Sequence, residues 1–255
     1  MGVMGKIIVF SNQKGGVGKT TTAVNLGAYI ADMGKKVLLI DFDPQGNLST
    51  FAGLDKDAPG IYEAIAGIKE IKDVIQKTPV ENLYGIGSNV NLSGAAIELA
   101  TVDNREKYLK TVLDDVKDEY DYIFIDSPPS LGLLSLNCLV ASDFIIIPMQ
   151  CEYFAMEGLS LLIQTISSVQ HSLNPNLKIG GILFTMYDSR IKLANEVVRN
   201  VTSYFGDKVF RTVIPRNVAL SEAPSHSVPI NLYRENCQGA FGYKKLAEEV
   251  INRVK

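Results

Sequence analysis

The 255-residue sequence contains no tryptophan, only three cysteines and only two histidines. The cysteines are odd in number and widely spaced, unlike those of a disulfide framework or a zinc site. The histidines are too few and too isolated to supply a metal site. These scarcities exclude a disulfide-rich secreted protein and a cysteine–histidine metalloprotein, and they favour reduced thiols in the cytoplasm. The residues concerned are Cys138, Cys151, Cys237, His171 and His226.

Long apolar runs and a strong excess of one charge are also missing. No run approaches the roughly 20 residues that a membrane-spanning helix needs, and Ile7–Phe10 is too short for the apolar core of a signal peptide. The net charge of −3 argues against a generally basic nucleic-acid binder. The charge is uneven, however, because residues 185–255 contain 11 Lys or Arg and 7 Asp or Glu. A local basic face in this C-terminal part is therefore allowed.

The sequence does contain a series of short apolar, β-branched runs separated by helical stretches. Strands of this kind, alternating with helices, predict a twisted and mostly parallel sheet covered by helices on both faces. Residues 1–255 show no linker, repeat or low-complexity tract, so we predict one α/β domain. The predicted strands are Ile7–Phe10, Val37–Ile40, Leu83–Ile86, Tyr122–Ile125, Phe144–Ile147, Ile182–Phe184 and Val209–Ile214.

A glycine-rich loop follows the first of these runs. Residues 14–20 read Lys-Gly-Gly-Val-Gly-Lys-Thr, and the apolar positions between Lys19 and Gly34 recur at helical spacing. In such a strand–loop–helix unit the backbone N–H groups and the helix N-terminus bind a polyphosphate. The loop predicts a P-loop NTPase domain that binds its nucleotide with Gly15, Gly16, Val17, Gly18, Lys19, Thr20 and Thr21.

Three positions in and beside the loop carry specific information. Lys19 is placed to reach the β- and γ-phosphates, and the Thr20 hydroxyl is placed to ligate Mg²⁺. The standard spacing has glycine where this chain has Gln13, and it does not require a lysine at position 14. Lys14 is one cation more than a single nucleotide site needs. We therefore count both Lys14 and Lys19 as candidates for the catalytic machinery.

The second predicted strand runs into Asp41-Phe42-Asp43-Pro44-Gln45-Gly46-Asn47. Residues two apart on an extended chain point the same way, so we expect both Asp41 and Asp43 to face the nucleotide. One would contribute to the Mg²⁺ shell, and the other would orient a water for attack on the γ-phosphate. We assign the water to Asp43, which is also a candidate metal ligand. The alternative is a surface turn, since this segment is rich in turn-forming residues.

The run Tyr122–Ile125 is followed by Asp126-Ser127-Pro128-Pro129. Apolar residues that end in an aspartate are typical of a Walker B strand, in which the aspartate reaches Mg²⁺ directly or through water. Asp126 is therefore the second candidate metal ligand, together with Thr20. The alternative is an aspartate that caps the next helix.

Seven segments, spread over almost the whole chain, resemble the ParA/Soj family of chromosome-partitioning ATPases. This family lies within a larger group, which includes MinD, that has a deviant Walker A loop. The phosphate loop marks only the broad group, whereas the segments at 150–155 and 221–226 point to the Soj-like branch. The segments are Asn12-Gln13-Lys14-Gly15-Gly16-Val17-Gly18-Lys19-Thr20-Thr21, Asp43-Pro44-Gln45-Gly46-Asn47, Asp126-Ser127-Pro128-Pro129, Gln150-Cys151-Glu152-Tyr153-Phe154-Ala155, Glu157-Gly158-Leu159, Ile214-Pro215-Arg216-Asn217 and Ser221-Glu222-Ala223-Pro224-Ser225-His226.

The resemblance implies an ATP hydrolase that uses ATP and Mg²⁺, and it implies a use for Lys14. In relatives the matching lysine crosses to the nucleotide of a second subunit, so that ATP is enclosed in a homodimer. Gly15 would lie where the two loops approach closely and a Cβ would clash. Pro215, Arg216 and Asn217 would lie against the adenine, as the matching segment does in relatives.

The resemblance also implies that the ATP-bound dimer binds double-stranded DNA without sequence preference, through Arg190, Lys192 and Arg216. Relatives often carry a further arginine where this chain has Ala219. The implied partner is a ParB-like DNA-binding protein that stimulates hydrolysis, and the implied location is the cytoplasm, on the nucleoid. No helix-turn-helix domain precedes the phosphate loop in this sequence, which argues against operator binding.

Two alternatives belong to other functional classes. A MinD-like ATPase that cycles on a membrane would need an amphipathic C-terminal helix beyond the fold. The segment 243–255 has a helical pattern, but its apolar residues suit packing on the domain and it carries Glu248 and Glu249. We therefore expect no membrane partner. The second alternative is an ATP-dependent ligase or an iron–sulfur reductase; the reductase needs paired cysteines, which Cys138 and Cys151 do not match.

Overall fold

The structure is a computed structural model that describes residues 5–98 and 102–254. In this part of the chain seven strands form one sheet in the order β3-β4-β2-β5-β1-β6-β7. Neighbouring strands are parallel except for β3 and β4, which are antiparallel. The strands are β1 (Lys6–Phe10), β2 (Val37–Asp41), β3 (Gln76–Lys77), β4 (Leu83–Ile86), β5 (Tyr122–Asp126), β6 (Phe144–Gln150) and β7 (Lys178–Thr185).

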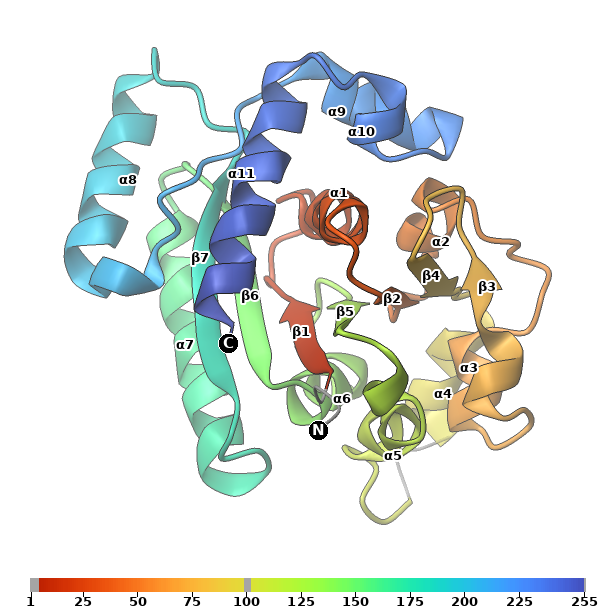
Figure 1. The fold of residues 1–255 in the computed structure, drawn as a ribbon. Helices are drawn as coiled ribbons and strands as arrows, with labels where there is room; N and C mark the ends of the chain where they lie inside the picture. The colour runs from red at the N-terminus through yellow and green to blue at the C-terminus, as the bar shows by residue number, and fades with distance from the viewer. Residues whose placement is uncertain (1–4, 99–101, 255) are drawn as a thin grey trace.

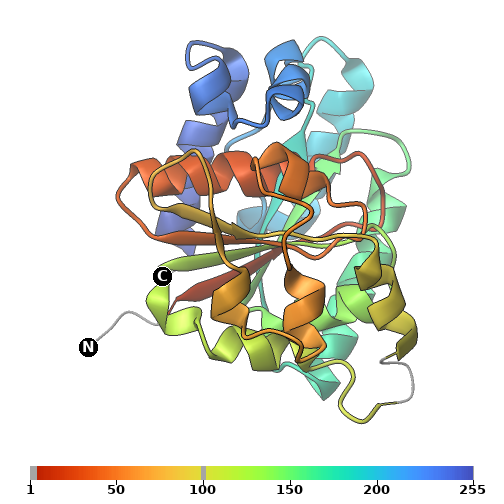
Figure 2. The ribbon, with the colours of Figure 1, turned by 90° about the vertical axis from the view of Figure 1, so that its right-hand side faces the viewer.

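Helices cover both faces of the sheet, which Figure 2 shows close to edge-on. α1 and α11 lie on one face, and α5, α6 and α7 lie on the other (Figure 1). The α-helices of the described chain are α1 (Lys19–Asp32), α2 (Asn47–Phe51), α3 (Ile61–Ile65), α4 (Asn91–Glu98), α5 (Tyr108–Asp114), α6 (Leu133–Ala141), α7 (Ala155–Ser172), α8 (Lys192–Phe205), α9 (Val218–Glu222), α10 (Ile230–Tyr233) and α11 (Gln238–Arg253).

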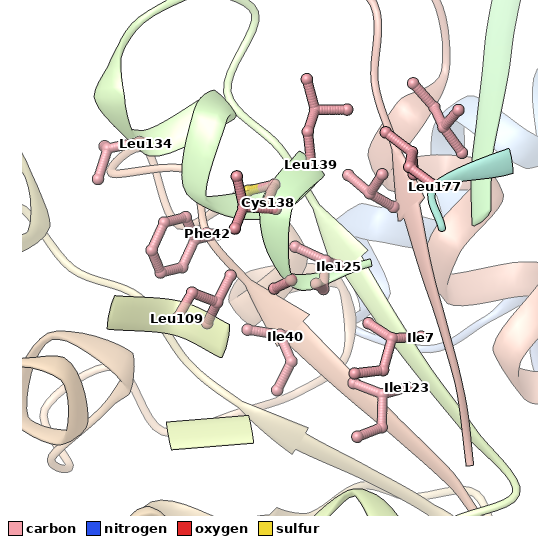
Figure 3. Close-up of a cluster of buried hydrophobic side chains, with 14 of the residues drawn as sticks. Ile7, Ile40, Phe42, Leu109, Ile123, Ile125, Leu134, Cys138, Leu139 and Leu177 are labelled. Atoms are coloured by element: carbon pink, nitrogen blue, oxygen red, sulfur yellow. The ribbon is translucent and has the colours of Figure 1, made fainter. Parts of the chain in front are cut away.

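The two faces of the sheet bury two separate apolar clusters. Side chains alternate along a strand, so Ile8 and Phe10 pack towards α1 and α11, whereas Ile7 and Val9 pack towards α5 and α6. Figure 3 shows part of the second cluster, where Ile40 and other strand residues meet side chains of α5 and α6. The predicted α/β architecture, with a mostly parallel sheet between two helical layers, is confirmed.

Six of the seven predicted strands are present, but the prediction of a strand at Val209–Ile214 is wrong. This segment meets β7 only through an isolated bridge between Val209 and Ile182 and single backbone hydrogen bonds, among them one of 2.9 Å from Phe210 N–H to the Ile182 carbonyl. Val209, Phe210 and Ile214 are buried because the segment covers the edge of the sheet, with the Phe210 ring lying over Gly181. The short β3 carries no apolar pattern and was not predicted.

The strand register brings the carboxyl ends of three strands, β1, β5 and β2, together at one edge of the sheet. β5 lies between β1 and β2, and Asp126 is paired in register with Phe10 on one side and Asp41 on the other. The loops that follow these three strands therefore converge, as expected for the ligand-binding edge of a parallel sheet.

The C-terminal helix α11 packs on the domain as the sequence predicted. Leu246, Val250 and Val254 are buried in the cluster that also contains α1 residues. Among the described helices, none has the length and apolar character that a membrane crossing requires.

Candidate functional site

The phosphate loop joins β1 to α1, and its shape depends on left-handed backbone conformations. Gly16 and Gly18 have φ values of 71° and 87°, which residues with a Cβ rarely adopt. Two polar residues from neighbouring strands hold the loop in place. The Gln150 amide donates to the Gly16 carbonyl at 2.8 Å, and the Thr185 hydroxyl donates to the Val17 carbonyl at 2.8 Å. Helix α1 begins at Lys19, as predicted.

Lys19 is a buried cation beside the loop. Its side-chain amine donates to the Asn12 carbonyl at 3.3 Å. Burial lowers the pKa of Lys19, while the nearby carboxylates of Asp126 and Asp43 act in the opposite direction. A polyanion bound in the loop would add further negative charge around this amine and favour its charged form.

Thr20 and Asp126, the two predicted metal ligands, lie in direct contact. The Thr20 hydroxyl donates to Asp126 Oδ2 at 2.5 Å. Asp126 is almost fully buried, and its other oxygen, Oδ1, has no hydrogen-bond partner within residues 5–98 and 102–254. Burial, with a contribution from the Asp41 carboxylate, raises the pKa of Asp126. A buried carboxylate oxygen without a partner, next to a hydroxyl, fits a hard cation such as Mg²⁺.

The expectation that both Asp41 and Asp43 face the nucleotide is wrong for Asp41. Asp41 is fully buried, and its Oδ2 accepts hydrogen bonds from the backbone N–H and the hydroxyl of Ser49, both at 2.7 Å. β2 ends at Asp41 and the chain then turns towards α2, so the alternation of a strand no longer applies. Asp43 is half-buried, and its Oδ1 accepts the Gln45 N–H at 3.0 Å.

A cavity of about 480 Å³ lies over the phosphate loop and is lined by most of the predicted loop residues, whereas Val17 and Asp126 are not among its lining residues. Asp43 lines it, whereas Asp41 is not among the lining residues. Those residues are Gly15, Gly16, Gly18, Lys19, Thr20, Thr21, Asp43, Gln45, Asn47, Thr50, Phe51, Pro129, Met186 and Pro224.

A smaller cavity of about 80 Å³ shares Gly18, Thr21 and Met186 with the first. The predicted adenine-binding residues Pro215, Arg216 and Asn217 line it, together with Thr185, Ile214, Leu220, Ser221 and Tyr243. Asn217 Oδ1 is buried and has no hydrogen-bond partner. An unpartnered acceptor in this cavity fits a base that presents an amino group.

Lys14 lies outside both cavities, although it belongs to the phosphate loop. Its backbone N–H donates to Asn12 Oδ1 at 3.0 Å, and its side-chain amine forms an ion pair with Glu152. Both side chains of the pair are about half exposed. Gly15, the next residue, is exposed, and a Cβ added there would meet no atom within 4 Å in this protomer.

The three candidate DNA-binding residues are exposed and come from two segments that pair with each other. Tyr187 and Pro215 form an isolated bridge, which brings the segment before α8 beside the one before α9. Arg190 donates two side-chain hydrogen bonds to the Asp188 carboxylate, from Nε at 2.9 Å and from Nη2 at 2.7 Å. This arginine lowers the pKa of Asp188 to about 2. Lys192 opens α8, and Arg216 follows the bridge.

Ala219 is buried at 2% exposure, so the position where relatives often carry arginine lies in the apolar cluster here. The residue before it, Val218, is 70% exposed. In this chain the neighbouring position 218, and not position 219, is therefore the one that could present an arginine side chain to solvent.

Three residues that support the site were not predicted from the sequence to have a role in it. Asn12, Gln150 and Thr185 lie at or just past the ends of β1, β6 and β7, and each binds the loop or its neighbours through a side chain. The Asn12 amide, for example, donates to the Pro148 carbonyl at 2.7 Å. Their position at strand ends was the available signal, because polar residues there lie at the ligand-binding edge.

Comparisons with known proteins agree with this geometry. A family model described as an AAA domain matches residues 5–179. The chromosome-partitioning ATPase Soj of Treponema pallidum is 59% identical, over 98% of this chain and 98% of that protein. The sporulation initiation inhibitor protein Soj of Bacillus subtilis is 53% identical, over 97% of this chain and 98% of that protein. The chain belongs to the Soj/ParA family of chromosome-partitioning ATPases.

A solved structure outside the Soj proteins has the same fold. Cobyrinic acid a,c-diamide synthase from Mycobacterium smegmatis, with bound ATP analogue and magnesium, is 35% identical and gives a TM-score of 0.87, over 97% of this chain and 94% of that one. It confirms the predicted nucleotide-binding fold. The Soj proteins are considerably more similar in sequence to this chain, so membership of the Soj/ParA family outweighs the ligase alternative.

Proposed function

We propose that this Soj/ParA-family ATPase partitions DNA by a cycle in which ATP joins two copies of the chain. The ATP-bound dimer binds duplex DNA on the nucleoid without sequence preference, and hydrolysis returns the chain to monomers. As a member of this family the chain hydrolyses ATP and uses Mg²⁺. The observation that carries the dimer proposal is the position of Lys14, which starts the phosphate loop yet lies outside the cavity that the loop lines.

Lys14 has the exposure that a contact in trans requires. Lys19 is buried and lines the nucleotide cavity of its own chain, whereas Lys14 is held on the surface by Glu152. Gly15 lies beside it with open space around its Cα. A second protomer approaching this rim would place its triphosphate within reach of Lys14. ADP lacks the γ-phosphate, so dimerisation would depend on the nucleotide state.

Within each chain, the residues in and beside the two cavities would either bind the nucleotide and the metal or position the attacking water. Lys19 would bind the β- and γ-phosphates, and Thr20 and Asp126 would hold Mg²⁺ through oxygen atoms. When bound, Mg²⁺ neutralises negative charge that develops on the transferred phosphoryl group. Asp43, half-buried at the same cavity, would orient the attacking water. Pro215, Arg216 and Asn217 would enclose the base.

The proposed partner is a ParB-like DNA-binding protein that accelerates hydrolysis. In related phosphoryl-transfer systems a cation supplied by a partner raises the rate by about 10³–10⁵. Slow intrinsic turnover is therefore expected, and an Arg or Lys of the partner would provide the additional charge. The packing of α11 on the domain favours this cycle on DNA over the MinD-like cycle on a membrane, because the apolar face of α11 is already buried.

Light scattering after size-exclusion chromatography tests the dimer. With Mg²⁺ and ATP, the wild-type chain should be dimeric, and Lys14→Ala should be a folded monomer. Lys35→Ala is the matched control, since Lys35 is also a surface lysine in an ion pair, with Asp121 at 3.1 Å, but lies in the connection between α1 and β2. Gly15→Val is a second test: a Cβ there meets no atom within 4 Å in one protomer, so the chain should fold. Because Gly15 also lines the nucleotide cavity, ATP binding to the monomeric variant has to be measured alongside its dimerisation. Normal dimerisation of Lys14→Ala would rule out the crossing role.

A further inference from the structure

Two adjacent aromatic side chains, Tyr153 and Phe154, stand exposed between β6 and α7. Each is 73% exposed, and their rings contact each other edge to face with centroids 5.1 Å apart. Neither belongs to the apolar clusters on the two faces of the sheet. Single exposed apolar residues are ordinary in folded proteins, but two adjoining aromatic rings present a large apolar area to solvent.

A second aromatic pair in the chain shows how such a pair can be explained by packing within one protomer. Tyr204 and Phe205, at the end of α8, make a similar edge-to-face contact with centroids 4.8 Å apart. There, Phe205 packs against the core and only Tyr204, at 78%, is exposed. Phe205 therefore attaches that pair to the core, whereas neither Tyr153 nor Phe154 packs against the described core clusters.

The segment that carries Tyr153 and Phe154 is tied to the phosphate loop at two points. The Gln150 amide binds the Gly16 carbonyl, and Glu152 forms the ion pair with Lys14. The aromatic pair is therefore continuous with the exposed rim formed by Lys14 and Gly15. Any surface that approaches Lys14 closely enough to use its charge also approaches these rings.

We infer that Tyr153 and Phe154 are anchors of the contact between two copies of this chain in the ATP-bound dimer. The inference rests on the proposed dimer and adds an apolar contact to it. In a symmetric dimer each protomer offers the same patch, so one pair of rings per chain contributes twice. Aromatic side chains dominate many protein interfaces because they bury a large area at a small cost in conformational entropy. Lys14 would make dimerisation depend on the γ-phosphate of ATP. The rings of Tyr153 and Phe154 would add an apolar attraction that does not depend on the nucleotide.

The test measures the protein concentration at which half of the chain is dimeric, by analytical ultracentrifugation with Mg²⁺ and the slowly hydrolysed analogue ATPγS. We expect Tyr153→Ala and Phe154→Ala each to raise this concentration by about tenfold. Tyr153→Phe retains the ring and should stay close to wild type. Tyr204→Ala removes an equally exposed aromatic from α8 and should have no effect. Thermal unfolding of each variant, and ATPγS binding to the monomer, should be unchanged because both rings are exposed.

The possible outcomes separate this inference from the proposed function. If the wild type dimerises and the two alanine variants dimerise equally well, the rings are not interface anchors and the inference is overturned, while the dimer stands. If the variants dimerise normally but a ParB-like partner no longer stimulates them, the rings bind that partner and the inference is again wrong. If the wild type stays monomeric with ATPγS at every concentration, the proposed dimer itself fails. Equal weakening by Tyr204→Ala would show a nonspecific effect and would also overturn the inference.

Discussion

Lys14 and Glu152 are 138 positions apart in the sequence, yet they form an ion pair at the rim of the nucleotide site. The pair holds the loop's surplus lysine away from the cavity that Lys19 lines. For Lys14 to reach a nucleotide on a second protomer, its bond to Glu152 has to break. In the proposed dimer, Glu152 would therefore compete with the partner's triphosphate for the same amine.

Removal of this competition should favour dimerisation. Exposed ion pairs contribute about 0–1 kcal/mol, and a symmetric dimer would break two of them. Glu152→Gln should therefore lower the concentration for half-dimerisation with ATP by about two- to tenfold, and the difference should shrink in high salt. Glu157→Gln, at another exposed carboxylate in the first turn of α7, is the control and should leave the midpoint unchanged. Weaker dimerisation of Glu152→Gln would instead indicate that Glu152 itself contacts the partner.

Asp43 and Asp41 should respond differently to substitution, because only Asp43 lines the cavity. Asp43→Ala should bind ATP with nearly normal affinity, form a long-lived dimer, and hydrolyse ATP more slowly by about 10²-fold or more. Asp41→Ala should instead lower the thermal unfolding temperature, because it leaves the Ser49 N–H and hydroxyl without their buried acceptor. Steady-state turnover and nucleotide titration separate the two. Unchanged turnover with a collapse of ATP affinity in Asp43→Ala would place Asp43 in the metal shell.

We expect Asn217, which lines the proposed base-binding cavity, to contribute to the choice of nucleotide. Its buried Oδ1 has no hydrogen-bond partner among the described residues and suits the amino group of adenine, whereas guanine presents a carbonyl at that position. Asn217→Ala should weaken ATP binding by about tenfold and reduce the preference for ATP over GTP. Asn231→Ala is the control, since Asn231 also has an unpartnered Oδ1 but is not part of the cavity lining. Equal losses for ATP and GTP would show that Asn217 acts only on the shape of the pocket.

The parts of the site that were predictable from sequence are those whose geometry is set within a few residues. The glycines of the phosphate loop, the start of α1 at Lys19 and the position of Asp126 at a strand end all follow from local pattern. The direction of Asp41 did not, because its partner Ser49 lies beyond a turn. The pairing of Lys14 with Glu152 depends on how β1 and β6 align in the sheet. Such tertiary neighbours leave no periodic signal in the sequence.

Glu249 gives a prediction for the dependence of stability on pH. Burial alone would raise its pKa, but hydrogen bonds from the backbone N–H groups of Arg211 and Thr212 and the Arg253 guanidinium lower it overall. A lowered pKa means that the stabilisation is complete above the usual value of 4.5 and is lost as pH falls through the folded-state value. Glu249→Gln should cost about 1.5 kcal/mol near neutral pH, with the two proteins converging in acid. Urea unfolding at several pH values measures this difference.

The neighbouring Glu248 provides the control for that experiment. It is exposed on the same helix, so Glu248→Gln should change stability little at any pH. A constant offset between wild type and Glu249→Gln across the whole acid range would contradict the assignment, because the loss would then not depend on ionisation.

DNA binding by the dimer should be controlled by the contact between Arg190 and Asp188. A phosphate that binds the Nε and Nη2 side of Arg190 would displace a carboxylate held there through two hydrogen bonds. Asp188→Asn should therefore strengthen DNA binding by the ATP-bound dimer, and Arg190→Glu should weaken it for every sequence alike. Lys110→Glu, which makes the same charge change on α5 at the opposite corner of the fold (Figure 1), is the control and should have a much smaller effect.

The structure also changes which substitution would add the charge that relatives carry. An arginine at the buried Ala219 would enter the apolar cluster, whereas Val218→Arg places the charge on the exposed surface beside Arg216. Each phosphate contact releases counterions, so the logarithm of the affinity should fall with the logarithm of the salt concentration, with a slope of about −0.9 per phosphate. Val218→Arg should steepen this slope by about one contact and Arg190→Glu should flatten it. Fluorescence anisotropy with unrelated duplexes measures both. Affinity that does not respond to salt, or binding to anionic vesicles in place of DNA, would contradict the proposed cycle.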